Sequence, residues 1–260
     1  VKRDIKKAIH YLKLSAEQND LRAQYDLGII YYEGKYIPRD IKKAIYFLSL
    51  SAKNYNNYAC LQLGFIYHEG KYIKKDIEKA VHFYKEASSF NESYAKNNLA
   101  IIYKNGFGNI IQKNIYMSKE YLLEAIKLKN DDAFLEMYNL ANIYLDEENG
   151  EYNNIIIDLL IKSSKESFYP AKILLCFLLT KNMNMVDQEQ IEKKLKEIHI
   201  NTENVQQILD WHKKIQTNLL IHNFSLENQY LKLRRTDFII IDGKIYSSDE
   251  FNNKFENRSC

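Results

Sequence analysis

The chain has 260 residues, of which 46% are hydrophobic and 27% charged, and its formal net charge is +3. These proportions are those of an ordinary soluble folded protein. Eight glycines and two prolines are too few for an all-β fold with many turns, and they suit long helices. Lys and Arg are interspersed with Asp and Glu, which argues against nucleic-acid binding, because nucleic-acid-binding modules usually have a one-sided basic face.

Three cysteines, Cys60, Cys176 and Cys260, have no regular spacing, so they predict neither a disulfide framework nor a metal site. Cys60 and Cys176 fall in apolar helical segments, where a cysteine acts as a small core residue. We therefore expect a reducing compartment, the cytoplasm. The longest purely apolar run, residues 173–179, is far shorter than the roughly 18 residues of a membrane span.

The first predicted helix covers residues 4–16. Its apolar residues recur with a period close to 3.6, and Asp4 stands where a side chain can cap the helix. Helices of this kind, called B-type here, recur at 40–52 and 76–88 and in looser form near 114–127 and 154–165.

A second kind of helix, called A-type here, alternates with the first. The A-type helices are predicted at 23–32, 59–68, 95–104, 136–145 and 171–179. Small residues recur within them, which predicts close approach of a neighbouring helix: Ala23, Gly28, Ala59, Gly64, Ala95, Ala100, Ala141 and Ala171. The two glycines cost about 1 kcal/mol each in a helix interior, so we expect a packing reason for them. Gly34, Gly70 and Gly106 follow A-type helices, where glycine can take the left-handed conformation.

The alternation has a fixed length. The string that starts at Leu27 starts again at Leu63 and at Leu99, so the period is 36 residues. A fixed period in this range is typical of a solenoid, in which each repeat buries its apolar face against its neighbours.

The period ends near residue 180. We expect a solenoid over 1–180, capping helices over 181–222 (187–198 and 203–222), and a tail over 223–260. In the tail, the sequence 238–246 predicts two strands around Asp242-Gly243, which is a strong hairpin signal, and a short helix is expected after Ser248. Because the chain opens on a B-type helix without its A-type partner, we also expect it to be a fragment of a longer repeat protein.

The repeated pattern resembles the Sel-one-like repeat family, a branch of the tetratricopeptide-like helical-repeat proteins. Members carry Ala-x-x-x-Leu-Gly-x-x-Tyr-x-x-Gly, a short connector and Asp-x-x-Lys-Ala. The matching residues are Ala23, Leu27, Gly28, Tyr31, Gly34, Asp40, Lys43 and Ala44, then Ala59, Leu63, Gly64, Tyr67, Gly70, Asp76, Lys79 and Ala80. The match is specific over 4–106 and weaker to about 179.

The resemblance implies an all-α fold: a right-handed solenoid of antiparallel helix pairs whose A-type helices line the concave surface. It also implies an adaptor role, because members scaffold complexes and many serve in bacterial–host interaction. Some cysteine-rich bacterial members were described as β-lactamases, but their regularly spaced cysteines are missing from this chain.

No catalytic constellation is evident in the sequence. The six histidines form no metal-binding pair at helical spacing around a glutamate, and neither a phosphate-binding loop nor a Gly-x-Ser-x-Gly elbow occurs. Acidic residues recur with the repeat, which favours a structural role. We therefore expect no enzyme activity and no cofactor.

The remaining candidate is a surface. Aligning the repeats on Leu27, Leu63 and Leu99 with tetratricopeptide-type groove positions gives a predicted partner-binding set on the concave groove: Arg22, Tyr25, Tyr32, Glu33, Tyr58, His68, Glu69, Tyr94, Asn97 and Lys104. Tyr and Arg dominate binding hot spots, so we expect a scaffold that binds a protein or peptide. For each tyrosine, half-buried packing between repeats is an equal alternative. At the level of the chain, the alternative is a regulatory or docking domain of a larger protein, with 223–260 as its docking element.

Overall fold

The computed structural model describes residues 4–129, 133–147, 154–164, 169–180, 238–241 and 244–247. The helices are α1 (Ile5–Glu17), α2 (Leu21–Glu33), α3 (Ile41–Lys53), α4 (Asn57–Glu69), α5 (Ile77–Ser89), α6 (Ser93–Asn105), α7 (Ile115–Lys129), α8 (Phe134–Glu147), α9 (Asn154–Ser163) and α10 (Tyr169–Thr180). Two strands, β1 (Phe238–Ile241) and β2 (Lys244–Ser247), pair in a two-stranded sheet, as the sequence predicts. The predicted capping helices and the helix after Ser248 lie outside the described residues.

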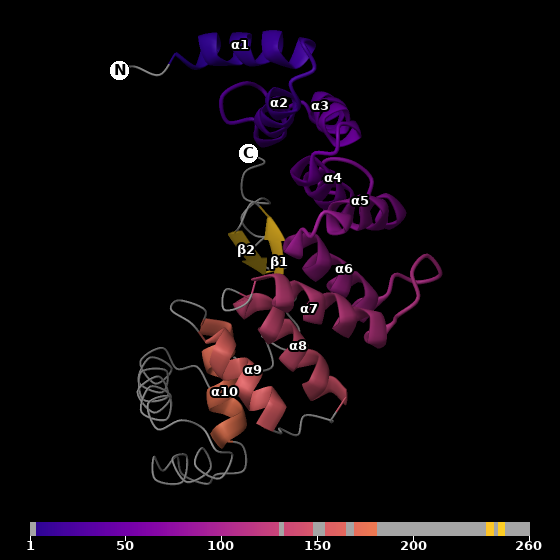
Figure 1. Ribbon diagram of the computed structural model, residues 1–260, viewed down its shortest axis with the longest axis vertical. Helices are drawn as coiled ribbons and strands as arrows, with labels where there is room; N and C mark the ends of the chain where they lie inside the picture. The colour runs from indigo at the N-terminus through magenta and orange to yellow at the C-terminus, as the bar shows by residue number, and fades with distance from the viewer. Residues whose placement is uncertain are drawn as a thin grey trace. The chain divides into compact units, whose positions relative to one another are not determined.

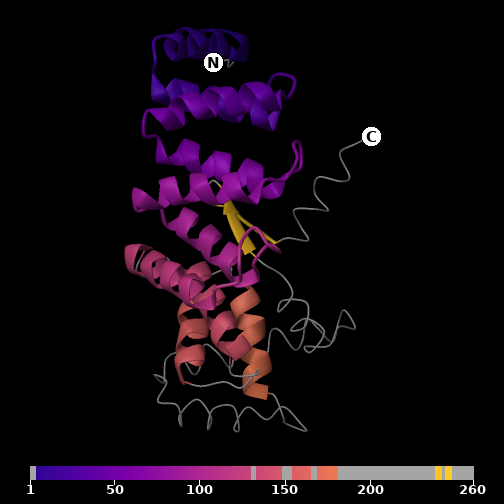
Figure 2. The same cartoon turned by 90° about the vertical axis from the view of Figure 1, so that its right-hand side faces the viewer.

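The predicted alternation of helices is confirmed: α2, α4 and α6 are A-type, and α1, α3 and α5 are B-type. Within the first unit the helix pairs follow one another along the long axis (Figures 1 and 2). The chain divides into two compact units, and the division falls within α7, between Tyr121 and Leu122. Each unit is described by itself below.

The B-type helices begin at the aspartates expected from the sequence. Asp4, Asp40 and Asp76 each accept a hydrogen bond from the backbone N–H three residues later, at 3.0–3.1 Å. These bonds satisfy donors that a helix leaves unpaired in its first turn. The backbone N–H of Lys43 or Lys79 holds the pKa of the capping carboxyl, Asp40 or Asp76, below its ordinary value.

The A-type helices have caps of their own, which the sequence analysis did not identify. Asp20 accepts from the N–H groups of Arg22 and Ala23, both at 2.9 Å, and Asn56 accepts in the same way at the start of α4. Glu92 takes this place before α6. The true helix starts are therefore two residues earlier than the predicted ones.

Glycine ends α2 and α4 as predicted. Gly34 and Gly70 have φ of 65° and 68° and lie in the left-handed region, where a Cβ is disfavoured. Gly106 differs, because its ψ of 166° takes the chain into an extended turn instead of the left-handed cap. The connector that follows is longer, and Phe107 pairs there with Ile111 in an isolated bridge.

Close approach between paired helices explains the two helical glycines. A Cβ on Gly28 would lie 2.6 Å from Cγ of Leu48, and a Cβ on Gly64 would lie 2.5 Å from Cδ1 of Tyr84. Both neighbours are fully buried side chains of the following B-type helix. The small residues predicted to allow close packing therefore do so here, since any larger residue would collide with the partner helix.

An aromatic stack repeats beside each close approach. Tyr31 stacks on Phe47, Tyr67 on Phe83 and Tyr103 on Tyr121, each with ring centroids 5.8 Å apart and planes within 10°. The ammonium groups of Lys43 and Lys79 lie over the free faces of the first two tyrosines, at 5.4 and 5.1 Å from the ring centres. The tyrosine that recurs in α2, α4 and α6 thus packs each of these helices against its B-type partner.

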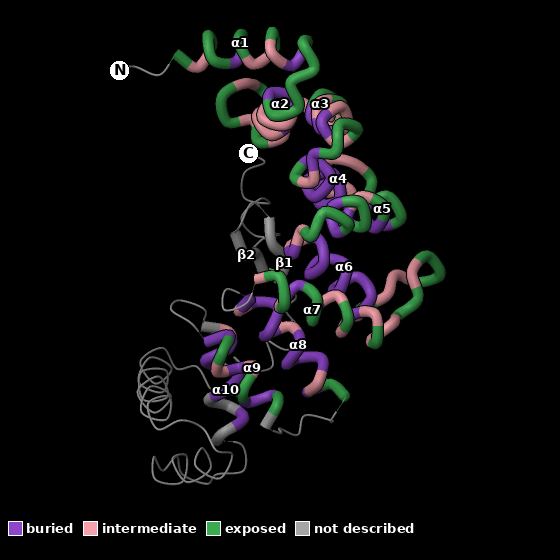
Figure 3. Tube along the Cα trace, viewed as in Figure 1, coloured by how far each residue is buried: buried purple, intermediate pink, exposed green. Residues whose placement is uncertain are grey.

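The core of the first unit runs through the helix pairs as successive clusters. One contains Leu27 and Ala44, the next Leu48 and Leu63, and the third Tyr84, with hydrophobic side chains of both helix types in each. Figure 3 shows that buried residues predominate in α4 and α6, whereas α1 carries mainly exposed and half-buried ones. This is the stacking of neighbouring repeats that a solenoid requires.

The second unit continues the alternation in a less regular form. Ala141 and Ala171 are fully buried, as the small residues of the earlier A-type helices are. When Leu140 is aligned with Leu99, Glu136 corresponds to Ala95 of α6. The side chain of Glu136 is fully buried. Its carboxylate lies 2.9 Å from the ammonium of Lys129, so the buried charge is paired.

We predict that Gly64→Ala lowers the free energy of unfolding by about 1–3 kcal/mol, because the added methyl group overlaps the ring of Tyr84. In the third repeat the corresponding residues are Ala100 and Leu122, so the double variant Gly64→Ala, Tyr84→Leu copies a combination that the chain already uses. Urea unfolding of both single variants and the double variant measures the coupling. The double variant should cost less than the sum of the single ones; strictly additive costs would contradict the proposed collision.

Candidate partner-binding surface

The predicted groove residues lie on α2, α4 and α6, the A-type helices of the first unit. The structure separates them by exposure. Arg22 and Glu33 are exposed, Tyr58 is 56% exposed, and Tyr25, Tyr32, His68, Glu69, Tyr94 and Lys104 are half-buried. Asn97 is fully buried. The residues of the set therefore differ in how much of their surface a partner could reach.

Four residues of the set that keep some exposed surface lie near the N-terminal ends of the A-type helices, whereas the exposed Glu33 is the last residue of α2. Arg22, Tyr58 and Tyr94 occupy the same position in three successive repeats, 36 residues apart. The ring of Tyr25 lies 6.5 Å from that of Tyr58, so the first two repeats share one aromatic surface. We call Arg22, Tyr25, Tyr58 and Tyr94 the N-terminal row.

Asp26 borders this row, one helical turn after Arg22. Burial raises the pKa of its carboxyl, and the positive charge of Arg22 opposes that rise. The carboxylate was missed in the sequence analysis because acidic residues occur throughout the repeats. Asp26 is half-buried and Arg22 is exposed, so this end of α2 carries both a negative and a positive group.

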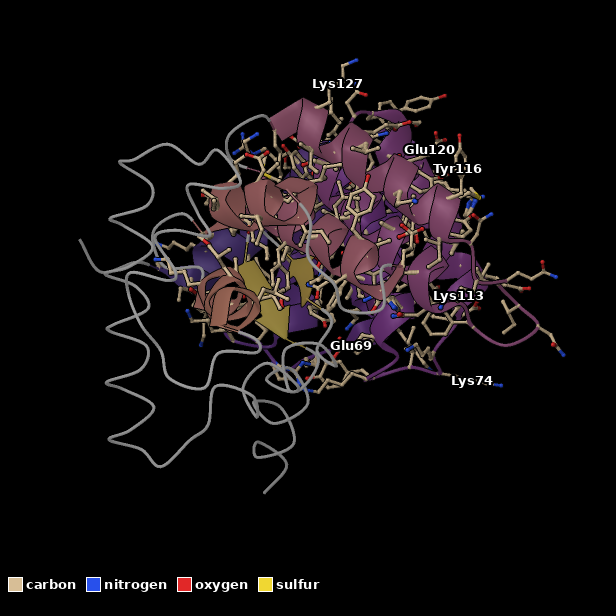
Figure 4. The ribbon with its side chains drawn as sticks, turned by 90° about the horizontal axis from the view of Figure 1, so that it is seen from below. Glu69, Lys74, Lys113, Tyr116, Glu120 and Lys127 are labelled. Carbon is tan, nitrogen blue, oxygen red and sulfur yellow. The ribbon has the colours of Figure 1, made fainter. Side chains whose placement is uncertain are left out.

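Tyr32 and Glu69 join successive A-type helices instead of lining a free groove. The hydroxyl of Tyr32 donates a hydrogen bond of 3.0 Å to Oε2 of Glu69, and the Tyr32 ring packs edge-on against Phe65 and Tyr72. Burial raises the pKa of Glu69 to about 7, although the bond from Tyr32 and the charges of Lys71 and Arg39 oppose the rise. Figure 4 labels Glu69 among the side chains drawn as sticks.

Arg39 completes this junction, and the sequence analysis missed it. Its guanidinium donates to the carbonyl oxygens of Tyr32 and Glu33 at 2.8 and 2.9 Å, which satisfies acceptors at the end of α2. The same group lies 4.3 Å from the ring centre of Tyr72 in the next repeat. The signal in the sequence was a basic residue directly before the capping aspartate, repeated as Lys75.

His68 packs between aromatic rings. Its ring lies edge-on to those of Tyr84 and Phe107, with centroids 6.0 Å apart in both cases, and its Nδ1 is 3.5 Å from the Tyr84 hydroxyl. Burial lowers the pKa of His68 to about 3, so the imidazole is neutral at physiological pH. Tyr32 therefore packs between repeats, which is the alternative stated for the tyrosines, and His68 packs between repeats as well.

Two more side chains of the A-type helices are inaccessible, those of Asn97, which belongs to the predicted set, and of Phe65, which does not. Asn97 has no exposed area, and Phe65, which the repeat pattern leaves variable, is 3% exposed. Alignment of the repeats places both residues on A-type helices, but it does not show how far neighbouring helices bury each side chain. Neither residue can meet a partner in this conformation.

Among the described residues, no group of three or more His, Cys, Asp or Glu side chains could hold a metal ion. Cys60 is buried, and burial raises the pKa of its thiol to about 12, so it is a core residue as predicted. None of the described helices is both long enough and apolar enough to span a bilayer.

Comparison with known proteins identifies the repeat. The family model described as Sel1 repeat matches residues 1–20, 21–56, 57–89 and 93–130. The chain belongs to the Sel1-repeat family. Proteins of this family are generally scaffolds for protein interaction. Among the curated proteins compared with the chain, none matches it significantly.

Solved structures support the same fold. A Sel1 repeat protein from Oxalobacter formigenes aligns with a TM-score of 0.60 and 21% identity, over 76% of this chain and 80% of that one. The protective antigen c5321 of uropathogenic Escherichia coli, which displays an SLR fold, aligns with a TM-score of 0.51 and 15% identity, over 94% of this chain and 62% of that one. The predicted family and the α-solenoid fold are thus confirmed.

We predict that Glu69 gives this Sel1 protein a distinctive pH dependence. Its pKa in the folded state, about 7, lies above the ordinary carboxyl value of 4.5, so the folded state keeps a proton that the unfolded state releases. That contribution to stability is present below about pH 4.5 and declines as the pH rises to about 7. Glu69→Gln removes the decline. Relative to wild type, its free energy of unfolding should rise by about 1 kcal/mol between pH 5 and pH 7.5, after allowance for solvent screening.

Urea unfolding at the two pH values measures this difference. His68 has the opposite dependence, because its pKa is lowered, but both proteins contain it and its effect cancels in the comparison. Glu33→Gln is the matched control, since Glu33 occupies the equivalent position one repeat earlier and is exposed. Equal pH dependence of Glu69→Gln and wild type would rule out the raised pKa.

Proposed function

We propose that this Sel1-repeat protein is a non-catalytic scaffold that binds a peptide or protein segment on the concave side formed by its A-type helices, with the N-terminal row as the main contact. The observation that carries the proposal is the exposure of the N-terminal row. The guanidinium of Arg22 and the ring of Tyr58, which is 56% exposed, occupy the same position in adjacent repeats. Family membership supports the general role of an interaction scaffold.

The physical chemistry of the row suits recognition of a segment with mixed apolar and acidic side chains. Tyrosine contributes a large rigid surface with a hydroxyl that can donate or accept, and arginine pairs with carboxylates in a fixed geometry. The solenoid places these groups at regular intervals on packed helices, so they are organised before binding. Tyr32 and His68, by contrast, would contribute by holding adjacent repeats at a fixed separation.

A second candidate function is a docking domain of a larger assembly, with residues 223–260 as the docking element. The observation in favour is the hairpin of β1 and β2. A two-stranded hairpin is marginally stable alone in water, so it needs a surface to pack on. Deletion of 223–260 would abolish association with the assembly if this role is correct and would leave it unchanged if the A-type surface alone binds.

We predict that Tyr58→Ala weakens binding of peptides selected on the immobilised protein from a random displayed library by about tenfold or more. Alanine removes an aromatic anchor, and loss of such an anchor commonly costs 1–2 kcal/mol or more. Fluorescence anisotropy with the selected peptides measures the change. Arg22→Ala should weaken the binding of acidic peptides in particular.

Tyr46→Ala is the matched control. Tyr46 is 59% exposed, almost the same as Tyr58, but it belongs to the B-type helix α3. This variant should bind like wild type. If Tyr46→Ala weakens binding and Tyr58→Ala does not, the binding surface is on the B-type helices and the proposal fails.

A further inference from the structure

Basic residues are concentrated on the connectors that run from each A-type helix to the B-type helix that follows it. In the first unit these connectors cover residues 34–40, 70–76 and 106–114. Their basic residues are Lys35, Arg39, Lys71, Lys74, Lys75 and Lys113. They contain two acidic residues, Asp40 and Asp76, which cap α3 and α5. We call the three connectors together the connector edge.

Contacts between successive connectors hold them side by side. The guanidinium of Arg39 in the first connector lies 4.3 Å from the ring centre of Tyr72 in the second. The ammonium of Lys75 in the second connector lies 5.1 Å from the ring centre of Phe107 in the third. Basic groups from three repeats therefore lie along one edge of the first unit.

The turns at the other ends of these helices differ in charge. Residues 18–20, 54–56 and 90–92 contain two acidic residues, Asp20 and Glu92, and no basic one. The helices of each pair are antiparallel, so these turns and the connectors lie on opposite edges of the unit. The fold thus separates charges that are interspersed in the sequence.

Most of the lysines on the connector edge have no carboxylate partner. The ammonium groups of Lys43 and Lys79, on the adjacent B-type helices, lie 3.2 and 3.1 Å from the carboxylates of Asp40 and Asp76, so both caps are already paired. Four connector lysines form no ion pair with any carboxylate that the structure describes: Lys35, Lys74, Lys75 and Lys113. All four are exposed, and Figure 4 labels Lys74 and Lys113.

Lys75 shows how a lysine of the edge differs from one that is already paired. Burial lowers the pKa of Lys75, whereas the hydrogen bond to Asp76 and the charge of that carboxylate raise the pKa of Lys79. The Lys75 ammonium has thus lost part of its hydration without gaining a carboxylate. Such a cation has less water to give up when an anion binds, so pairing stabilises it more than it would a fully hydrated lysine.

We propose that the connector edge binds an acidic polypeptide segment. Its carboxylates would pair with lysines from all three connectors: Lys35, Lys74, Lys75 and Lys113. Apolar side chains between the carboxylates would contact Tyr36 and Ile110, which are 48% and 55% exposed. The connector edge is distinct from the N-terminal row, which lies at the other ends of the A-type helices, so the two binding proposals are independent.

Two features favour a polypeptide over a nucleic acid at this edge. Asp40 and Asp76 lie between the basic groups, where they would repel the closely spaced phosphates of a nucleic acid but leave room for separated carboxylates. The ring of Tyr72 is also engaged where a base would have to stack, because Arg39 and Lys71 both lie over it.

A fluorescein-labelled peptide of alternating glutamate and serine is the probe. Fluorescence anisotropy with the full chain should show saturable binding that weakens as salt is added. The double variant Lys74→Gln, Lys75→Gln should weaken it by about fivefold or more, the effect of losing two ion pairs at a protein surface. Lys35→Gln, Lys113→Gln should have a similar effect from the other two connectors. Circular dichroism checks that each variant keeps its helices.

The matched control is Lys13→Gln, Lys53→Gln, which lowers the net charge by the same amount. Lys13 and Lys53 are exposed and belong to the B-type helices α1 and α3, outside the connectors. This variant should bind the glutamate peptide like wild type. Tyr58→Ala, which removes the aromatic anchor of the N-terminal row, should also leave this binding unchanged.

Three outcomes would overturn the proposal. The first is that the glutamate peptide does not bind, and the second is that the control variant weakens binding as much as the connector variants do, which would indicate attraction by net charge alone. The third is tighter binding of another anion that the connector variants also weaken. Single-stranded oligothymidylate and vesicles that contain phosphatidylserine are the probes for it, and such a result would assign the edge to nucleic acid or to a membrane surface.

Discussion

The close approach of each A-type helix to its B-type partner is the constraint on which the first unit depends. At Gly28 and Gly64 the partner's side chain occupies the space that a Cβ would fill. Such an approach fixes where the two helices cross, since displacement of either helix along its axis would bring a larger side chain to the crossing point. The tyrosine three residues later then meets an aromatic ring of the partner, as Tyr31 meets Phe47. One glycine and one tyrosine per repeat thereby set the register of the pair.

The junction between repeats uses a second set of side chains. Tyr32 donates to Glu69, and Arg39 connects the end of α2 with Tyr72 of the next repeat. Tyr32, Glu69 and Tyr72 are half-buried, whereas Arg39 is exposed. Their directional polar contacts specify one geometry, whereas apolar contacts alone would allow the helices to slide. Side chains at the C-terminal ends of α2 and α4 are therefore engaged in contacts between repeats. The N-terminal row lies at the other end of the same helices, where Arg22 and Tyr58 are exposed.

The sequence was sufficient to predict the helices, the fold and the family, because those follow from a repeated pattern of small, apolar and capping residues. The close approach at Gly28 and Gly64 was also predictable, since glycine in a helix needs a packing reason. The candidate site was predicted less well. Alignment placed Tyr32, His68 and Asn97 beside Tyr58, but their exposure depends on neighbours that are distant in sequence. Tyr32 is covered by Glu69 and Phe65, which only the assembled repeats bring together.

The helices α1 and α3, which are nearly identical in sequence, illustrate the same limit. Ala8 and Ala44 have the same sequence surroundings, yet one is exposed and the other is fully buried. The difference lies in the helix packed on top, not in the residue. Burial in a repeat protein therefore depends on the neighbouring helices as well as on the repeat sequence.

The central claim is that partners bind on the A-type helices, and site-specific photo-crosslinking tests it most directly. A benzophenone amino acid in place of Tyr58 or of Tyr46 samples two positions of nearly equal exposure on the two helix types. With a peptide selected for binding to the protein, illumination should give a crosslinked product from position 58 and none from position 46. A product from position 46 alone would contradict the account.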